Sequence, residues 1–114
     1  MVPQFIDTDV QTALTILGRR DTSHDDNAVI DLRNMCLGTA DLRNANLSEA
    51  NLVGTDLFAA FLTGAKFVNA KLNGANLEGA ILRNTDFTKA DLSNATLTRT
   101  GTPITDTTTQ GVWW

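Results

Sequence analysis

Residues 40–57 read ADLRNANLSEANLVGTDL, and within this stretch a leucine returns at every fifth position. The same period continues in both directions without a register slip and covers fourteen pentapeptides. Because self-similarity at a fixed short period indicates a repeat architecture, it has to be interpreted before any local structure. The fourteen central residues are Leu32, Leu37, Leu42, Leu47, Leu52, Leu57, Leu62, Phe67, Leu72, Leu77, Leu82, Phe87, Leu92 and Leu97.

A second position of the repeat is small. Two residues before the central residue lies Ala in ten of fourteen cases, with Thr55 and Thr85 as near equivalents and Ile30 and Met35 as large exceptions. A straight α-helix turns about 100° per residue, so a period of five would spread the leucines around the whole cylinder. A flat strand has a period of two, so an odd repeat would send successive leucines to opposite faces. Only a chain that bends every five residues keeps both positions inside a coil.

The number of sides in one coil follows from which residues match when they stack. An offset of 20 residues places Phe67 on Phe87, and it also gives the matched pairs Phe61 with Ile81, Lys66 with Asp86, and Lys71 with Asp91. An offset of 15 would instead bring Lys66 to Ile81 and Phe61 to Asn76. The sequence therefore predicts four sides, with weak ladder pairs between the stacked opposite charges.

The corners of the coil are also encoded. The second residue after the central one is Gly or Asn in nine of the fourteen repeats, namely Asn34, Asn44, Gly54, Gly64, Asn69, Gly74, Gly79, Asn84 and Asn94. Gly and Asn accept the positive φ that tight turns require. We therefore expect a turn at this position of each repeat.

Four pentapeptides carry a family resemblance: Ala-Asp-Leu-Arg-Asn (40–44), Ala-Asn-Leu-Ser-Glu (45–49), Ala-Asn-Leu-Glu-Gly (75–79) and Ala-Asp-Leu-Ser-Asn (90–94). They resemble the repeats of pentapeptide-repeat proteins. The resemblance covers residues 30–99 and implies an all-β solenoid, a right-handed four-sided parallel β-helix of about 3.5 coils. Departures lie mostly at the outward position before the central residue, where Asp or Asn is usual and where this chain has Cys36, Phe61, Lys66, Lys71, Ile81 and Thr96.

Residues 1–29 are predicted to cap the first coil, which would otherwise expose core and unpaired backbone. Val10, Leu14 and Leu17 recur at helical spacing, which predicts a capping helix over about residues 8–18, followed by an acidic loop at 19–29. This helix resembles the one that precedes the repeats in bacterial and cyanobacterial members of the family. A partner-binding or membrane-surface helix is the alternative interpretation.

Residues 100–114 form a third segment that is rich in Thr and contains Pro103, which predicts an irregular tail. Trp113 and Trp114 end the sequence. Their large apolar area favours burial, so they are candidates to cover the last coil or to pair two molecules end to end. A disordered tail is the alternative.

Composition excludes several classes of protein. Thirteen acids against nine bases give a net charge of -4, which disfavours binding to nucleic-acid phosphates. One cysteine, Cys36, and one histidine, His24, supply neither an internal disulfide nor an ordinary zinc site. No apolar run approaches the roughly 18 residues of a membrane helix, and acids stand where a signal peptide has bases. We expect a cytoplasmic protein with no metal, no cofactor and no membrane insertion.

A solenoid filled with Leu and Ala has no catalytic pocket, and its outward side chains diverge, so we expect no enzyme activity. Phe58 and Phe61 occupy outward positions on either side of one corner, and Phe61 stacks on Ile81. Contiguous apolar surface on a polar solenoid indicates a contact site, so these three residues are the candidate interaction patch. The alternative is that they only cover one another.

The expected function is a non-catalytic rigid scaffold or protein–protein interaction module with an unknown protein partner, present as a monomer or weak dimer. The resemblance also implies an alternative, because the best-understood family activity is inhibition or protection of DNA gyrase by rods that imitate DNA. Residues 30–99 hold seven acids and seven bases, so this short solenoid is neutral, unlike DNA. A purely structural domain of a larger protein is a further alternative.

Overall fold

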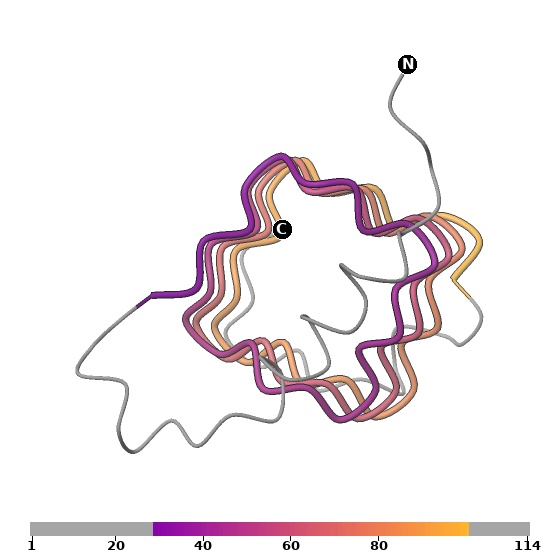
Figure 1. Cartoon of the computed structure of the whole chain (residues 1–114), viewed down its shortest axis with the longest axis horizontal. Helices are drawn as coiled ribbons and strands as arrows, with labels where there is room; N and C mark the ends of the chain where they lie inside the picture. The colour runs from indigo at the N-terminus through magenta and orange to yellow at the C-terminus, as the bar shows by residue number, and fades with distance from the viewer. Residues whose placement is uncertain (1–28, 101–114) are drawn as a thin grey trace.

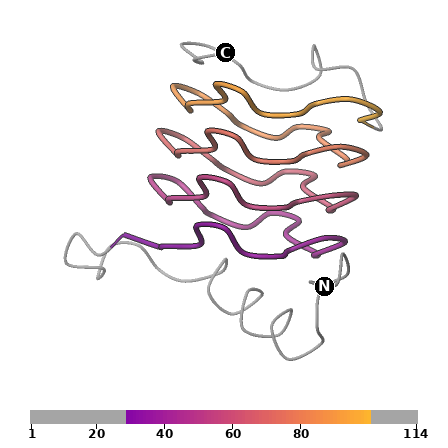
Figure 2. The same cartoon turned by 90° about the horizontal axis from the view of Figure 1, so that it is seen from above.

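Residues 29–100 are described by a computed structural model, and they form a coil that winds upward through stacked, nearly superimposed turns (Figure 1). Figure 2 shows the coils lying one above another, and backbone hydrogen bonds join each coil to the next. Neither a helix nor a continuous strand occurs between residues 29 and 100. Each pentapeptide instead contributes one isolated parallel bridge, followed by a two-residue turn.

The bridges confirm that one coil contains four pentapeptides. All ten are parallel and join residues 20 positions apart, as in Phe61 with Ile81. The four sides are named here by their central residues. Face 1 contains Leu32, Leu52, Leu72 and Leu92, face 2 contains Leu37, Leu57, Leu77 and Leu97, face 3 contains Leu42, Leu62 and Leu82, and face 4 contains Leu47, Phe67 and Phe87.

Backbone hydrogen bonds between coils follow one rule wherever the adjacent coil is described. On face 1, the N–H groups of Leu52 and Gly54 donate to carbonyls of the following coil at 2.7 and 2.9 Å, while that of Asn51 donates backward to Ile30 at 2.8 Å. The N–H of Thr55 closes the turn on the carbonyl of Leu52 at 3.1 Å. Four of the five backbone donors of a pentapeptide are thus satisfied by backbone oxygens, and the fifth belongs to the first turn residue, directly after the central one.

All fourteen corners contain a residue with positive φ at the second turn position, with values from 54° to 73°. The turn signal in the sequence is therefore confirmed where Gly or Asn stands. Five further corners hold residues that rarely adopt this conformation, and these are Thr39, Glu49, Ala59, Lys89 and Arg99. Because a Cβ in the left-handed region approaches the carbonyl oxygen that follows it, each of these corners stores backbone strain.

The core is formed by the two predicted inward positions. The central residues from Leu32 to Leu92 and the alanines that precede them from Ala40 to Ala90 are buried, while Ile30, Met35, Ala95 and Leu97 pack against them in part. The rings of Phe67 and Phe87 stack at 5.3 Å between centroids, as the offset of 20 predicts. Thr55 and Thr85 also point inward, and their hydroxyls donate to the carbonyls of Leu32 and Leu62 at 2.6 and 2.8 Å.

Several predictions concern residues outside the described range of 29–100. These are the capping helix at 8–18 with Val10, Leu14 and Leu17, the acidic loop up to residue 28, and the tail that ends in Trp113 and Trp114. They remain predictions.

Replacing both Glu49 and Lys89 with Asn is expected to raise the free energy of unfolding by about 1 kcal/mol per site, because Asn enters the left-handed region more readily. Within residues 29–100, neither side chain forms an ion pair or a side-chain hydrogen bond that the change would remove. Urea denaturation of wild type and of the E49N/K89N variant measures the difference.

Gly74→Ala is the matched control, because it is expected to lower the free energy of unfolding instead of raising it. A Cβ at Gly74 would meet nothing within 4 Å, so only its φ of +68° opposes the substitution. We expect a loss of about 1 kcal/mol. Unchanged stability in Gly74→Ala would mean that the corners are not strained.

Candidate interaction surface

The residue directly before each central residue determines whether the fifth backbone donor is satisfied. Where it is Asp or Asn, its Oδ1 accepts a hydrogen bond from the N–H of the first turn residue, two positions on, at 2.9–3.2 Å. This local bond is an Asx turn. The eight residues that make it are Asp31, Asp41, Asn46, Asn51, Asp56, Asn76, Asp86 and Asp91.

Six repeats lack this side-chain acceptor. The residues in its place are Cys36, Phe61, Lys66, Lys71, Ile81 and Thr96, and within residues 29–100 no hydrogen bond is donated by the N–H two positions after any of them. In the intact repeats that N–H points toward the outward side chain, so in the six others it is directed to the same side. Five of these six donor residues are at least partly exposed, whereas Gly38 is buried. Sequence reasoning identified these departures but not the open donors that they leave, although the alternation of Asp or Asn with other residues carried the signal.

Face 3 is where the repeats of two adjacent coils both lack the acceptor. Phe61 and Ile81 are bridged neighbours there, and the open donors are the N–H groups of Thr63 and Arg83. On faces 1 and 4, one repeat each lacks the acceptor, at Lys71 and Lys66. On face 2, the two repeats that lack it, at Cys36 and Thr96, lie at opposite ends of the column.

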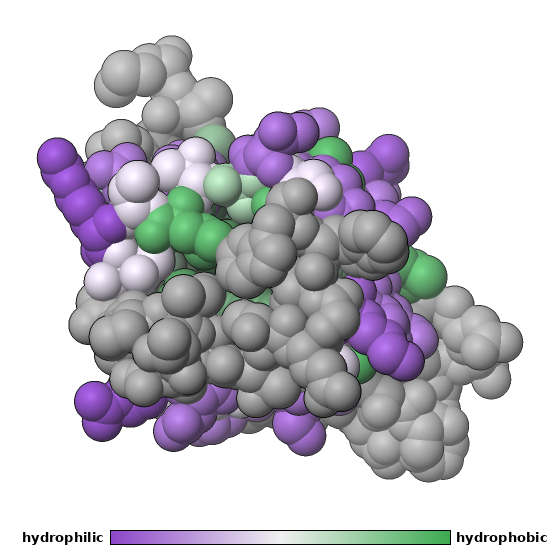
Figure 3. Space-filling view, turned by 180° about the vertical axis from the view of Figure 1, so that it is seen from behind, coloured by the Kyte–Doolittle hydropathy of each residue, from purple (hydrophilic) through white to green (hydrophobic). Residues whose placement is uncertain are grey.

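The structure places two of the three residues of the predicted apolar patch, Phe61 and Ile81, on one face. Phe61 is 41% exposed, while Ile81 and Phe58 are half-buried. Phe61 and Ile81 share face 3, whereas Phe58 is the first turn residue of the corner that leads from face 2 into it. In the view along the coil axis from behind, hydrophilic residues make up most of the visible rim of the described region, and hydrophobic surface is confined to small areas (Figure 3).

Two exposed ion pairs form within single repeats. Arg43 holds Asp41 with two bonds, Nε to Oδ1 at 2.8 Å and a terminal nitrogen to Oδ2 at 2.7 Å, and Arg33 holds Asp31 in the same way. These hydrogen bonds raise the pKa of both guanidinium groups, and the bond from Arg33 lowers the pKa of Asp31. A longer contact of 3.7 Å joins Arg99 to Glu78 on face 2.

The predicted ladder pairs between stacked opposite charges do not form ion pairs in the described region. Lys66 and Lys71 are bridged to Asp86 and Asp91 as expected, but neither lysine forms an ion pair within residues 29–100. The carboxylates are engaged locally instead. Asp86 accepts from the N–H and hydroxyl of Thr88 at 2.9 and 2.5 Å.

Asp91 shows the same local preference. Its Oδ1 accepts from the Ser93 N–H at 3.0 Å and its Oδ2 from the Asn73 amide at 2.7 Å. Hydrogen bonds from Ser93, followed by the Asn73 amide, hold the pKa of this carboxyl below its ordinary value.

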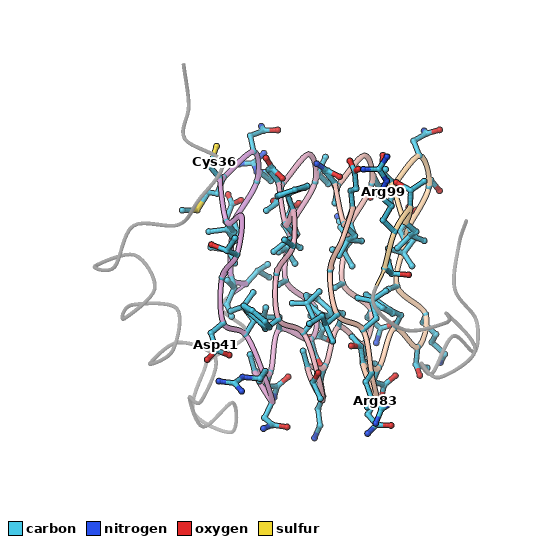
Figure 4. All side chains as sticks on the ribbon, turned by 90° about the vertical axis from the view of Figure 1, so that its right-hand side faces the viewer. Cys36, Asp41, Arg83 and Arg99 are labelled. Atoms are coloured by element: carbon cyan, nitrogen blue, oxygen red, sulfur yellow. The ribbon has the colours of Figure 1, made fainter. Side chains whose placement is uncertain are left out.

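Charge is distributed unevenly over the four faces. Face 3 carries Arg43 and Arg83 against Asp41, a net of +1, while faces 1 and 4 are neutral and face 2 has a net of −1. Figure 4 shows Asp41 and Arg83 on one side of the solenoid, at opposite ends, with Cys36 and Arg99 on the other side. Arg83 is exposed and forms no ion pair in the described region.

The described residues also bear on metal binding, thiol chemistry and membrane insertion. No group of three His, Cys, Asp or Glu residues within 29–100 is placed to hold a metal ion. Cys36 is a free, partly exposed thiol, and His24 lies outside the described range. The same residues form no helix with the length and hydropathy needed to cross a membrane.

Comparison with family models matches pentapeptide repeats (8 copies) over residues 30–64 and 60–99. A comparison with curated protein sequences finds no match.

Solved pentapeptide-repeat structures are similar in fold. One from the thylakoid lumen of Arabidopsis thaliana is 27% identical, with a TM-score of 0.61 over 72% of this chain and 59% of its own. One from the cyanobacterium Cyanothece is 30% identical, with a TM-score of 0.55 over 85% and 74%. QnrB1, a plasmid-mediated fluoroquinolone resistance protein, is 26% identical, with a TM-score of 0.57 over 67% and 35%. The match thus spans less than two thirds of the Arabidopsis protein and of QnrB1.

The acceptor role of Asp91 predicts a pH-dependent contribution to stability. A carboxyl whose pKa is lowered by folding stabilises the fold above its unfolded pKa of about 3.9, and the contribution is lost as the pH falls through the folded value. Asp91→Asn keeps an oxygen for the Ser93 N–H but removes the charge. Urea denaturation should therefore show wild type more stable than D91N at pH 7, with the difference decreasing as the pH falls below about 3.9. A difference that stays constant across this range would contradict the assignment.

Proposed function

The chain belongs to the pentapeptide-repeat family, and from this premise we propose that it is a non-catalytic scaffold whose function is to bind another protein. Members of the family form right-handed quadrilateral β-helices. They are generally structural or interaction modules without catalytic activity. The proposal assigns this general role to a particular surface of this chain.

The observation that carries the proposal is the apolar interruption on face 3. Phe61 is exposed where the intact repeats place Asp or Asn, and its stacked neighbour Ile81 continues the apolar surface. An outward position tolerates polar residues, as the eight Asx turns show, so packing of the core does not require an aromatic there. Together with Phe58 at the adjacent corner, these residues supply the anchor for a partner.

A rigid backbone suits this role. Hydrogen bonds of 2.7–3.0 Å join each coil to the next along all four faces, and every corner is closed by a turn. Side chains on one face are therefore held at fixed spacing, about 4.8 Å per coil. A preorganised surface loses little conformational entropy when a partner binds.

The remaining features of the proposal concern the whole chain. We propose that residues 1–29 form an N-terminal capping segment, that 30–99 form the repeat solenoid and that 100–114 form an irregular tail. The protein would be cytoplasmic and a monomer or weak dimer, and its partner would be a protein rather than a nucleic acid. A structural role within a larger protein is the alternative that leaves face 3 without a partner.

A DNA-mimic activity against gyrase has less support. QnrB1 is a fluoroquinolone resistance protein of similar fold. However, residues 30–99 are neutral, and their charges are divided so that one face is positive. Duplex DNA carries one negative charge per about 1.7 Å of its axis, a pattern that this surface does not reproduce.

The double substitution Phe58→Ser and Phe61→Ser tests the proposal. In pull-down from cells of the source organism, wild type should retain a protein that the F58S/F61S variant loses, because the variant lacks the aromatic anchors. A V53S/V68S variant is the matched control, since it removes two partly exposed apolar residues from faces 1 and 4. Identical capture by all three proteins would exclude face 3 as the binding site.

A DNA supercoiling assay distinguishes the proposed function from the DNA-mimic alternative. We expect micromolar protein to leave DNA gyrase activity unchanged, because its solenoid lacks the negative surface of a DNA mimic. Inhibition, or protection of gyrase from a quinolone, would favour the DNA-mimic function over the one proposed.

A further inference from the structure

Face 3 presents two backbone donors that the fold itself leaves open. In intact repeats, an Asp or Asn oxygen accepts the N–H two positions on, as Asp56 does for Phe58 at 3.0 Å. On face 3 the same acceptor position is vacated in consecutive coils, so the N–H groups of Thr63 and Arg83 point outward one above the other. An oxygen from outside the chain can therefore accept from these two N–H groups in the place of the missing Asp or Asn oxygens.

We propose that face 3 binds an acidic segment of a partner protein, in which a carboxylate lies next to an apolar side chain. The carboxylate accepts hydrogen bonds from the N–H groups of Thr63 and Arg83, in the place of the missing Asp or Asn oxygens. The apolar side chain packs on Phe61 and Ile81. This inference rests on the proposed function and names the chemistry of its partner.

Charge favours a carboxylate over a neutral oxygen. Face 3 has the highest net charge of the four faces, +1. The guanidinium of Arg43 is already engaged by Asp41 at 2.7 Å, whereas Arg83 forms no ion pair within residues 29–100. Arg83 thus contributes both an open backbone donor and an uncompensated positive charge at the same place. Hydrogen bonds to a charged acceptor are roughly twice as strong as neutral ones.

The other interruptions lack this combination. Lys66 and Lys71 each stand alone in their columns, with an Asx residue on both sides. Their faces are neutral and carry the carboxylates Asp86 and Asp91 in the next coil, which would repel an incoming anion. On face 2, Cys36 and Thr96 lie at opposite ends of the column, so their open donors are not adjacent.

The test uses a peptide array as its probe. The array holds octapeptides in matched pairs, each pair differing only in a central Asp or Asn and carrying Leu or Phe at a neighbouring position. Wild type should bind Asp members about tenfold more tightly than their Asn partners, since two charge-assisted hydrogen bonds and Arg83 are gained. This preference should weaken as the salt concentration rises.

The decisive variant restores the intact repeat. Phe61→Asn with Ile81→Asn supplies internal acceptors for both open N–H groups, using the residue that already stands at Asn46, Asn51 and Asn76. The F61N/I81N variant should fold and lose the preference for Asp. The K66N/K71N variant restores two repeats on other faces and should keep it. F61A/I81A leaves the donors open, so it should bind more weakly but still prefer Asp.

The outcomes separate this inference from the proposed function. Equal binding of Asp and Asn peptides, no binding to any pair, or a preference that persists in F61N/I81N would overturn the acidic-partner inference. Self-association of wild type that F61N/I81N abolishes, without any preference for Asp, would identify a second copy as the occupant and also overturn it. In each case, protein capture that F58S/F61S loses would still support the interaction function.

Discussion

The whole solenoid depends on one conformational constraint, a residue with positive φ at the second turn position of every pentapeptide. This rotation brings the chain around by one side every five residues, so that four repeats close a coil and residues 20 positions apart are stacked. The inward columns, the inter-coil hydrogen bonds and the stacked rings of Phe67 and Phe87 all follow from that closure. Because the constraint recurs fourteen times, its cost is offset coil by coil rather than at a single site.

Sequence reasoning recovered the features that repetition makes visible. The spacing of Leu and Ala predicted the core, and the matched pairs at offset 20 predicted the coil. At Thr39, Glu49 and Lys89 only the period of five predicts a turn, because these residue types do not themselves favour positive φ and adopt it since the neighbouring repeats impose the geometry. Similarly, Thr55 was recognised as small, but its hydrogen bond to the carbonyl of Leu32 depends on a contact between coils.

The stacked charges show that residues placed next to each other by the offset of 20 do not necessarily form an ion pair. Lys71 and Asp91 are neighbours in adjacent coils, yet the carboxylate bonds to Ser93 and Asn73. A bond to the backbone two residues away orders a short side chain at little entropic cost, whereas an exposed pair must also immobilise a long lysine. The same local bond explains the candidate surface, because the residue that provides or withholds the acceptor decides whether a donor on the face remains open.

An open donor is not equally costly at every position on the solenoid. At Lys66, a polar side chain leaves water free to accept from the N–H of Val68, so little stability is lost. At Phe61 and Ile81, a partner that packs on the two apolar side chains, as we propose, also excludes water from the open N–H groups of Thr63 and Arg83. The less water a donor can reach, the more a partner's oxygen gains by satisfying it. The apolar side chains and the open donors of face 3 therefore reinforce each other, and either feature alone would make a weaker binding surface.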